Sequence, residues 1–162
     1  HRFSGKIMCK TKTRSSIMAD MPTTQSPILY PTMTYRDAAR MIDWLENAFG
    51  FRKHVAYAGE DGKVIHAELA LGDNLLMLGT AKPDSAFGKL VKPPSDVGAT
   101  TQAVYIAVPD ADVLFAKAKA AGAEIVMELT DQPYGSRDFI CKDPEGQVWC
   151  FGTYAPKVPA GD

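Results

Sequence analysis

Apolar residues near the C-terminal end of the chain form two short runs separated by a polar break. The first run covers residues 139–141 and the second covers residues 148–151. The break reads Asp143-Pro144-Glu145-Gly146, in which proline presets φ for a tight turn and glycine suits the exit from it. Two strand-length apolar runs around such a turn predict a β-hairpin.

The expected register of this hairpin pairs Lys142 with Gln147, and therefore Phe139 with Cys150. Because side chains alternate along a strand, this register gives the hairpin two faces. One face is expected to pack on a helix and the other to line a core or a pocket. Phe139, Cys141, Val148 and Cys150 share one of these faces, and Ile140, Trp149 and Phe151 share the other.

The hairpin belongs to the second of two similar stretches of the chain. A shorter hairpin is predicted at residues 69–79, and each hairpin is preceded by a strand, an aspartate, a helix and a glycine. Asp110 follows Asp37 by 73 residues, and Gly152 follows Gly79 by the same interval. A repeat of this length is too long for a solenoid unit. It predicts an α+β fold built from two tandem βαβββ modules.

The period of the apolar residues also predicts where the other elements lie. We expect strands at 28–35, 51–58, 64–71, 75–78, 101–108 and 124–129, and helices at 38–49 and 111–121. Asp37 is expected to cap the first helix and Gly50 to end it. These elements form one domain over residues 28–155, in which module one covers 28–80, a proline-rich linker covers 81–100 and module two covers 101–155. Residues 156–162 are expected to form a tail.

Residues 1–27 show no sustained apolar period and are expected to be a disordered lead-in. Residues 1–17 contain arginine and lysine but no acidic residue. Such a segment fits a targeting peptide. It also fits an extension left by cloning or upstream translation, with the natural start at Met18 or Met21.

Composition narrows the class of protein. The net charge is −1, so no electrostatic feature favours nucleic acid or an anionic membrane as a partner. No apolar run approaches the roughly 20 residues that span a bilayer. The three cysteines, Cys9, Cys141 and Cys150, form no C-x-x-C motif and no disulfide framework. A cytoplasmic, reducing setting is therefore expected.

Three segments together resemble the vicinal oxygen chelate superfamily, which includes the glyoxalases, the bleomycin-resistance proteins and the extradiol dioxygenases. They are residues 35–51, residues 66–73, and residues 134–139 with the following 143–146 turn and Trp149. The resemblance covers about residues 28–155. It implies that each module curls its sheet into a half-barrel and that paired modules enclose one cavity. It also implies a homodimer, in which the linker can cross to the other subunit.

The resemblance further implies four places from which metal-dependent members of the superfamily supply His, Glu or Gln ligands. In this sequence they fall at Tyr30, Met77, Ala103 and Cys150. Alanine offers no donor, and one cysteine cannot hold zinc, which takes three or four N, S or O ligands. No metal or other cofactor is therefore expected.

Two polar groups are candidates for a role in the cavity, and each also has a structural interpretation. His66 and Glu68 share a strand face and could act as an acid–base pair, or form a polar rim or a subunit contact. Arg137 could bind a ligand carboxylate or phosphate, or pair with Asp131 or Asp138. His54 is expected on a solvated edge strand.

An apolar, aromatic pocket suits a flat or hydrophobic ligand. The first hypothesis is therefore a protein that binds a small, partly hydrophobic molecule in the cavity between the modules without a metal. The alternative is a lyase or isomerase that uses a metal or the His66–Glu68 pair. The third hypothesis is a module that binds another protein through the linker. No charged or amphipathic pattern in the sequence supports it. The residues expected to line the pocket are Tyr30, Met77, Tyr105, Phe139 and Cys150.

Overall fold

The structure, a computed structural model, describes residues 27–160. The predicted lead-in and Cys9 therefore lie outside the described residues, apart from Pro27. Module one consists of β1 (Thr32–Tyr35), α2 (Ala38–Phe49), β2 (Arg52–Ala58), β3 (Val64–Leu71) and β4 (Asn74–Thr80). A short helix, α3 (Pro94–Val97), lies in the linker. Module two consists of β5 (Val104–Ala107), α4 (Ala111–Ala120), β6 (Glu124–Asp131), β7 (Arg137–Lys142) and β8 (Val148–Gly152).

The two modules have the same topology. Sheet one has the strand order β1-β4-β3-β2 and sheet two has the order β5-β8-β7-β6. The first and last strands of each module pair in parallel, and the other pairs are antiparallel. This topology confirms the predicted α+β fold of two tandem βαβββ modules with mixed sheets. No helix of residues 27–160 is long and apolar enough to cross a membrane.

The helices begin and end where local side chains predict. Asp37 precedes α2, and its carboxylate accepts a hydrogen bond of 3.0 Å from the backbone N–H of Arg40. Gly50 follows α2 with a φ of 80°, the left-handed conformation that only glycine adopts without strain. Asp110 caps α4 in the same way through the N–H of Val113. These caps depend on residues close in sequence, which is why the pattern alone located both helices.

One hydrophobic core lies between the sheets and is shared by both modules. The ring of Phe49 on α2 lies 5.2 Å from the ring of Trp149 and 4.7 Å from that of Phe151, both on β8. Trp44 on α2 donates a hydrogen bond of 2.9 Å to the carbonyl of Ala121, just after α4. The two helices therefore bring the buried faces of both sheets into a single core.

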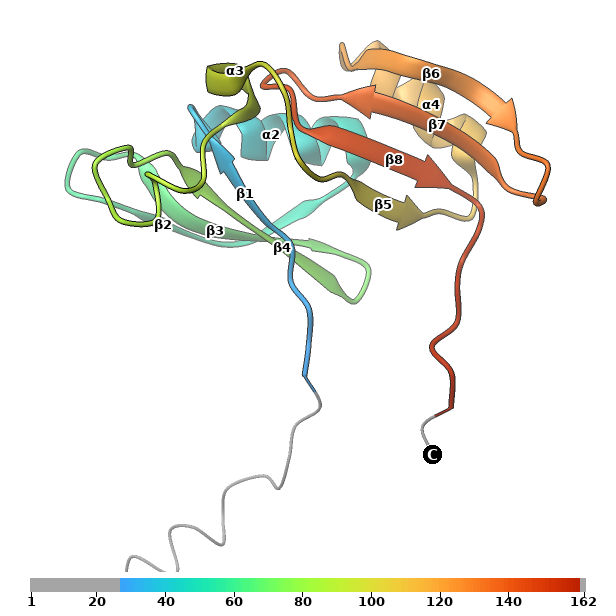
Figure 1. The fold of residues 1–162 in the computed structure, drawn as a ribbon, viewed down its shortest axis with the longest axis horizontal. Coiled ribbons are helices and arrows are strands. Elements are labelled where there is room, and N and C mark those ends of the chain that lie inside the picture. The colour runs from blue at the N-terminus through green and yellow to red at the C-terminus, as the bar shows by residue number, and fades with distance from the viewer. Residues whose placement is uncertain (1–26, 161–162) are drawn as a thin grey trace, which may run out of the picture.

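The predicted enclosure of a cavity by the two sheets is not seen within the chain. Figure 1 shows sheet one beneath α2 and sheet two in front of α4, and the sheets do not wrap around a common interior. Each sheet uses its helix-facing side for the shared core. The other side of each sheet is left without a helix over it.

The register of the β7–β8 hairpin differs from the prediction by one residue. The backbone N–H of Asp143 donates a hydrogen bond to the carbonyl of Gln147, so the turn between them has three residues. As a result, Phe139 pairs with Phe151 and Cys141 pairs with Trp149. Gly146, with a φ of 91°, supplies the left-handed residue that such a three-residue turn requires. A slip of one residue moves every side chain of β8 to the opposite face.

The hairpin turn docks module two onto module one through a buried carboxylate. Asp143 is 4 % exposed, and its Oδ2 accepts hydrogen bonds from the Tyr35 hydroxyl at 2.7 Å and the Trp149 indole N–H at 3.1 Å. Its Oδ1 accepts from the backbone N–H groups of Glu145 and Gln147, both at 3.0 Å. Burial raises the pKa of Asp143, although all four hydrogen bonds act to lower it.

A second carboxylate in the same turn completes this contact. Glu145 is 7 % exposed and accepts hydrogen bonds from the backbone N–H groups of Arg36 and Asp37, just before α2. A helix N-terminus has unpaired N–H groups and favours negative charge, so the carboxylate is well placed there. We call Asp143, Glu145 and Tyr35 the module latch, because they join the turn of module two to the first helix and strand of module one.

Replacing the latch aspartate should destabilise the whole domain. Asp143→Ala leaves several buried donors without an acceptor, and we expect a loss of about 2–4 kcal/mol in the free energy of unfolding. Urea unfolding at neutral pH measures it. Asp73→Ala is the matched control, since Asp73 lies in the equivalent hairpin of module one and is exposed. Equal effects of the two substitutions would contradict the structural role given to Asp143.

Candidate functional site

The side of each sheet that carries no helix holds five of the candidate residues, namely His66, Glu68, Met77, Tyr105 and Cys150. We call these surfaces open face one and open face two. Strand alternation and pairing place Thr32, His66, Glu68 and Met77 on open face one, because Met77 lies beside both Thr32 and Glu68. They place Tyr105, Asp138, Ile140, Cys150 and Gly152 on open face two.

Open face one brings His66 and Glu68 together as predicted from their spacing. The His66 Nε2 lies 3.2 Å from the Glu68 Oε1, and the two side chains are 41 % and 24 % exposed. The ring of Tyr57, on the neighbouring strand, stacks on the imidazole with 6.2 Å between ring centroids. Glu68 and Tyr57 thus both orient the His66 imidazole, as proton transfer would require. The pair is also accessible enough to form a polar rim.

A small cavity lies next to His66. It has a volume of about 300 Å³, and it is lined by β1, β3 and β4 on one side and by linker residues between 81 and 91 on the other. Met77 and Thr32 belong to its wall. Two of the predicted site residues, His66 and Met77, therefore share one cavity.

A larger cleft of about 860 Å³ separates the two modules at the β1 and β5 strands. Tyr30 and Tyr105 both line it, together with the β3–β4 hairpin tip. The cleft contains neither Met77 nor Cys150 in its wall. The structure therefore divides the predicted lining residues among the small cavity, the cleft and open face two.

Phe139 lies on the side of β7 that faces the helices, not on an open face. It is fully buried, and its ring contacts those of Phe115 on α4 and Phe151 on β8. Trp149 is also buried in the core, as expected. The assignment of Phe139 to the pocket lining followed from the incorrect register, which placed it on the same face as Cys150.

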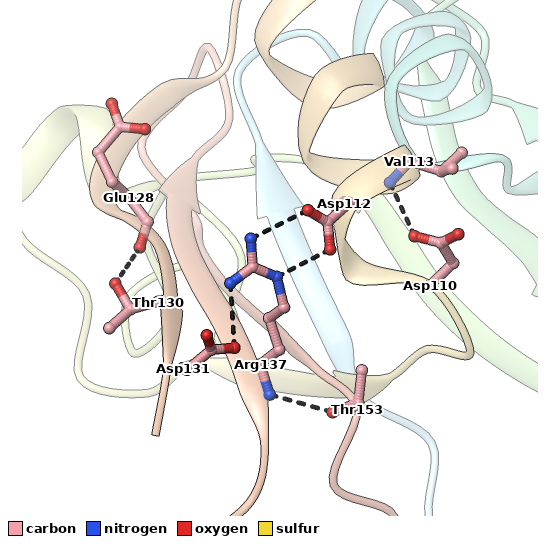
Figure 2. A network of polar contacts seen from close by, with 8 residues as sticks. All are labelled: Asp110, Asp112, Val113, Glu128, Thr130, Asp131, Arg137 and Thr153. Atoms are coloured by element: carbon pink, nitrogen blue, oxygen red, sulfur yellow. Dashed lines mark hydrogen bonds and ion pairs between the residues drawn. The ribbon is translucent and has the colours of Figure 1, made fainter. Parts of the chain in front are cut away.

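Arg137 is held by two acidic side chains on the helix side of sheet two (Figure 2). It donates two hydrogen bonds to Asp112 on α4, at 2.8 and 3.0 Å, and one of 3.0 Å to Asp131 on β6. These hydrogen bonds raise the pKa of Arg137 and lower that of Asp112. Asp131 was one of the two acidic partners predicted for Arg137 from the sequence. Asp112 was missed because it lies 25 residues away in sequence.

Asp138, the other acid considered as a partner of Arg137, lies on the opposite face and has no ion-pair partner among the described residues. It is 7 % exposed and accepts hydrogen bonds from the Ser136 and Tyr134 hydroxyls. Sequence reasoning did not select Asp138 or Tyr134 as functional residues. The signal that could have identified them is their spacing of four residues across the turn that leads into β7.

The residues at the family's metal positions do not fit a metal ion. Met77 pairs with Thr32, and Cys150 pairs with Tyr105. The first pair offers a thioether and a hydroxyl, and the second pair offers a thiol and a phenol. Among residues 27–160, no three His, Cys, Asp or Glu side chains lie close enough together to hold one. Zinc, iron and nickel sites need more N, S or carboxylate donors than this set offers.

The two described cysteines lie on opposite sides of sheet two. Cys141 is fully buried in the core, and burial raises the pKa of its thiol to about 12. Cys150 is half-buried on open face two, and burial together with the negative charge of Asp138 raises its pKa. Both thiols are free, and both are poor nucleophiles at neutral pH.

Thiol labelling should therefore separate the two faces of sheet two. In a Cys9→Ser background, we expect maleimide to label Cys150 slowly at neutral pH and faster as the pH rises, and to label Cys141 only on unfolding. Peptide mass spectrometry distinguishes the sites, and urea-unfolded protein is the control for full reactivity. Faster labelling of Cys141 than of Cys150 in the folded protein would contradict this assignment of the two faces of sheet two.

Comparison with known proteins agrees with this fold. The crystal structure of TioX from Micromonospora sp. ML1 is 30 % identical, with a TM-score of 0.61, and the match covers 78 % of this chain and 98 % of that one. An uncharacterised protein of Mycobacterium bovis is 36 % identical over 132 residues, which cover 82 % of this chain and 86 % of that protein.

A more distant structure shares the fold alone. The fosfomycin resistance protein FosX from Mesorhizobium loti has a TM-score of 0.54 at 16 % identity, over 82 % of this chain and 95 % of its own. The sequence model of the Glyoxalase/Bleomycin resistance protein/Dioxygenase superfamily matches residues 28–151. The chain therefore belongs to the glyoxalase, bleomycin-resistance and dioxygenase superfamily.

Proposed function

We propose that this protein binds a small, partly hydrophobic molecule on its open sheet faces without a metal ion. The observation that carries the proposal is that both sheets present a helix-free face bearing aromatic, sulfur and hydroxyl groups, next to a cleft of about 860 Å³. The side chains of Tyr105 and Tyr30 are 42 % and 37 % exposed there. Apolar walls with a few polar groups are typical of ligand sites, and the metal positions lack a ligand set.

We further propose that the site is completed by a second copy of the chain. Open face one and open face two lie on different sheets whose helix-facing sides share one core, so they cannot face each other within one chain. In a two-fold dimer, open face one of one copy can meet open face two of the other. The exposed edges of β1 and β5 support this, because unpaired strand edges invite pairing with another chain.

The alternative function is a lyase or isomerase reaction that uses His66 and Glu68 for proton transfer. The 3.2 Å contact between them and the cavity of about 300 Å³ beside His66 favour it. In such a reaction Glu68 would orient the imidazole and His66 would move the proton. Among residues 27–160 no three His, Cys, Asp or Glu side chains lie close enough together to hold a metal ion, so we assign the acid–base steps to this pair alone.

A thermal-shift screen tests the binding function directly. We expect a partly hydrophobic compound to raise the unfolding temperature, since a ligand that binds only the folded state stabilises it, whereas zinc, nickel, cobalt, manganese and iron(II) leave it unchanged. A clear stabilisation by one of these metals, or no response to any compound in the library, would count against the proposal.

His66→Ala, applied to a compound found in the screen, separates the two functions. In a binding protein, the substitution changes affinity and no turnover exists to lose. In an enzyme that uses His66, turnover of the compound falls by about a hundredfold or more while affinity is kept. His54→Ala is the matched control, because His54 is exposed on the edge strand β2.

A further inference from the structure

Open face two contains a cluster of tyrosines around a buried carboxylate, which we call the tyrosine cluster. Its members are Tyr105, Tyr134, Tyr154, Ser136 and Asp138. Asp138 is 7 % exposed, whereas the three tyrosines are 42 %, 65 % and 54 % exposed. The rings of Tyr134 and Tyr154 lie edge to face, with 6.4 Å between their centroids. The cluster therefore presents aromatic surface to solvent above a covered negative charge.

The charge of Asp138 is not neutralised within the described part of the chain. Only neutral hydroxyls touch it, since the Tyr134 hydroxyl donates to Oδ2 at 2.6 Å and the Ser136 hydroxyl donates to Oδ1. Arg137, the adjacent cation, points to the other side of the sheet and is occupied by Asp112 and Asp131. A carboxylate largely removed from water without a counter-ion is costly, and it favours a cation nearby.

The hydroxyl protons of Tyr105, Tyr134 and Ser136 point inward. The Tyr134 proton goes to Asp138, and the Tyr105 hydroxyl donates to the Tyr154 carbonyl at 2.8 Å. The Ser136 hydroxyl donates to Asp138 and accepts from the Tyr154 N–H at 3.0 Å. The outward-facing parts of these phenols are therefore acceptor lone pairs and ring faces. Such a surface attracts donors and cations.

The backbone leaves space for this arrangement at one position. A Cβ at Gly152 would overlap both the Asp138 carboxylate and the Tyr105 hydroxyl. Glycine there allows the carboxylate and the phenol to lie directly over β8, next to Cys150. The cluster is thus continuous with the open face on which the ligand is proposed to bind.

We propose that the tyrosine cluster is a subsite for a cationic group, such as a protonated amine or a quaternary ammonium, carried by a partly hydrophobic ligand. Aromatic faces within about 6 Å of a cation attract it, and the carboxylate beneath them adds to that attraction. This inference rests on the proposed binding function and specifies the ligand class. It selects a molecule with a positive head group and an apolar body over a neutral or anionic one.

Three aromatic probes that differ in charge test the subsite. Benzyltrimethylammonium, benzyl alcohol and benzoate are titrated into the full-length protein, with amide chemical shifts in NMR spectra as the readout. We expect the cation to bind about tenfold more tightly than the alcohol and to shift the amides of residues 134–138 and 152–154, whereas benzoate should not bind there.

Two kinds of variant test which residues give the preference. Asp138→Asn removes the charge and should reduce the preference for the cation about fivefold, while Asp131→Asn makes the same change on the opposite face and should leave it intact. If Asp138→Asn does not fold, Tyr154→Leu removes one exposed ring, keeps both hydroxyls that donate to the carboxylate, and should weaken cation binding.

The possible failures of the two proposals are distinguishable. Equal binding of cation and alcohol on open face two, or an unchanged preference in Asp138→Asn, overturns the cationic subsite but leaves the binding function in place. Absence of cation binding at the cluster also overturns the subsite. The binding function itself is contradicted by the outcomes of the thermal-shift screen given above, such as the absence of any stabilising compound.

Discussion

The fold depends on the contact between the turn of the second hairpin and the start of the first helix. Asp143 gathers four donors, among them the Tyr35 hydroxyl and the Trp149 indole, and Glu145 covers the N–H groups before α2. The side chains of Tyr35, Trp149, Asp143 and Glu145 are buried, so water is a poor substitute for these partners. The latch therefore fixes how the modules meet, and with it the directions in which the open faces point.

Because the latch and the helices occupy the inner side of both sheets, the ligand chemistry that we propose belongs to the outer sides. On open face one this chemistry is a His–Glu pair beside a small cavity. On open face two it is a covered carboxylate beneath exposed tyrosines. The two faces complement each other in character, since one supplies an acid–base pair and a thioether and the other supplies aromatic rings and negative charge. A dimer that brings them together would form a site with an apolar wall and a cation-selective end.

Sequence reasoning located the elements whose causes are local and failed where the cause is distant. The helix caps at Asp37 and Asp110 and the repeat were readable from neighbouring residues. The register of β8 was wrong because Gly146 forms a three-residue turn rather than a four-residue break. That single error moved Phe139 onto the wrong face. The contact of Arg137 with Asp112 depends on how α4 lies against sheet two, which no local pattern specifies.

Mixing two defective variants tests the central claim, that the ligand site is shared between two copies. Met77→Arg blocks open face one and Cys150→Arg blocks open face two, so each variant alone should bind no ligand. In a mixture that exchanges subunits, heterodimers keep one site with both walls intact. The account predicts recovery of about a quarter of the wild-type number of sites, counted by isothermal titration calorimetry. No recovery on mixing, or normal binding by either variant alone, would contradict it.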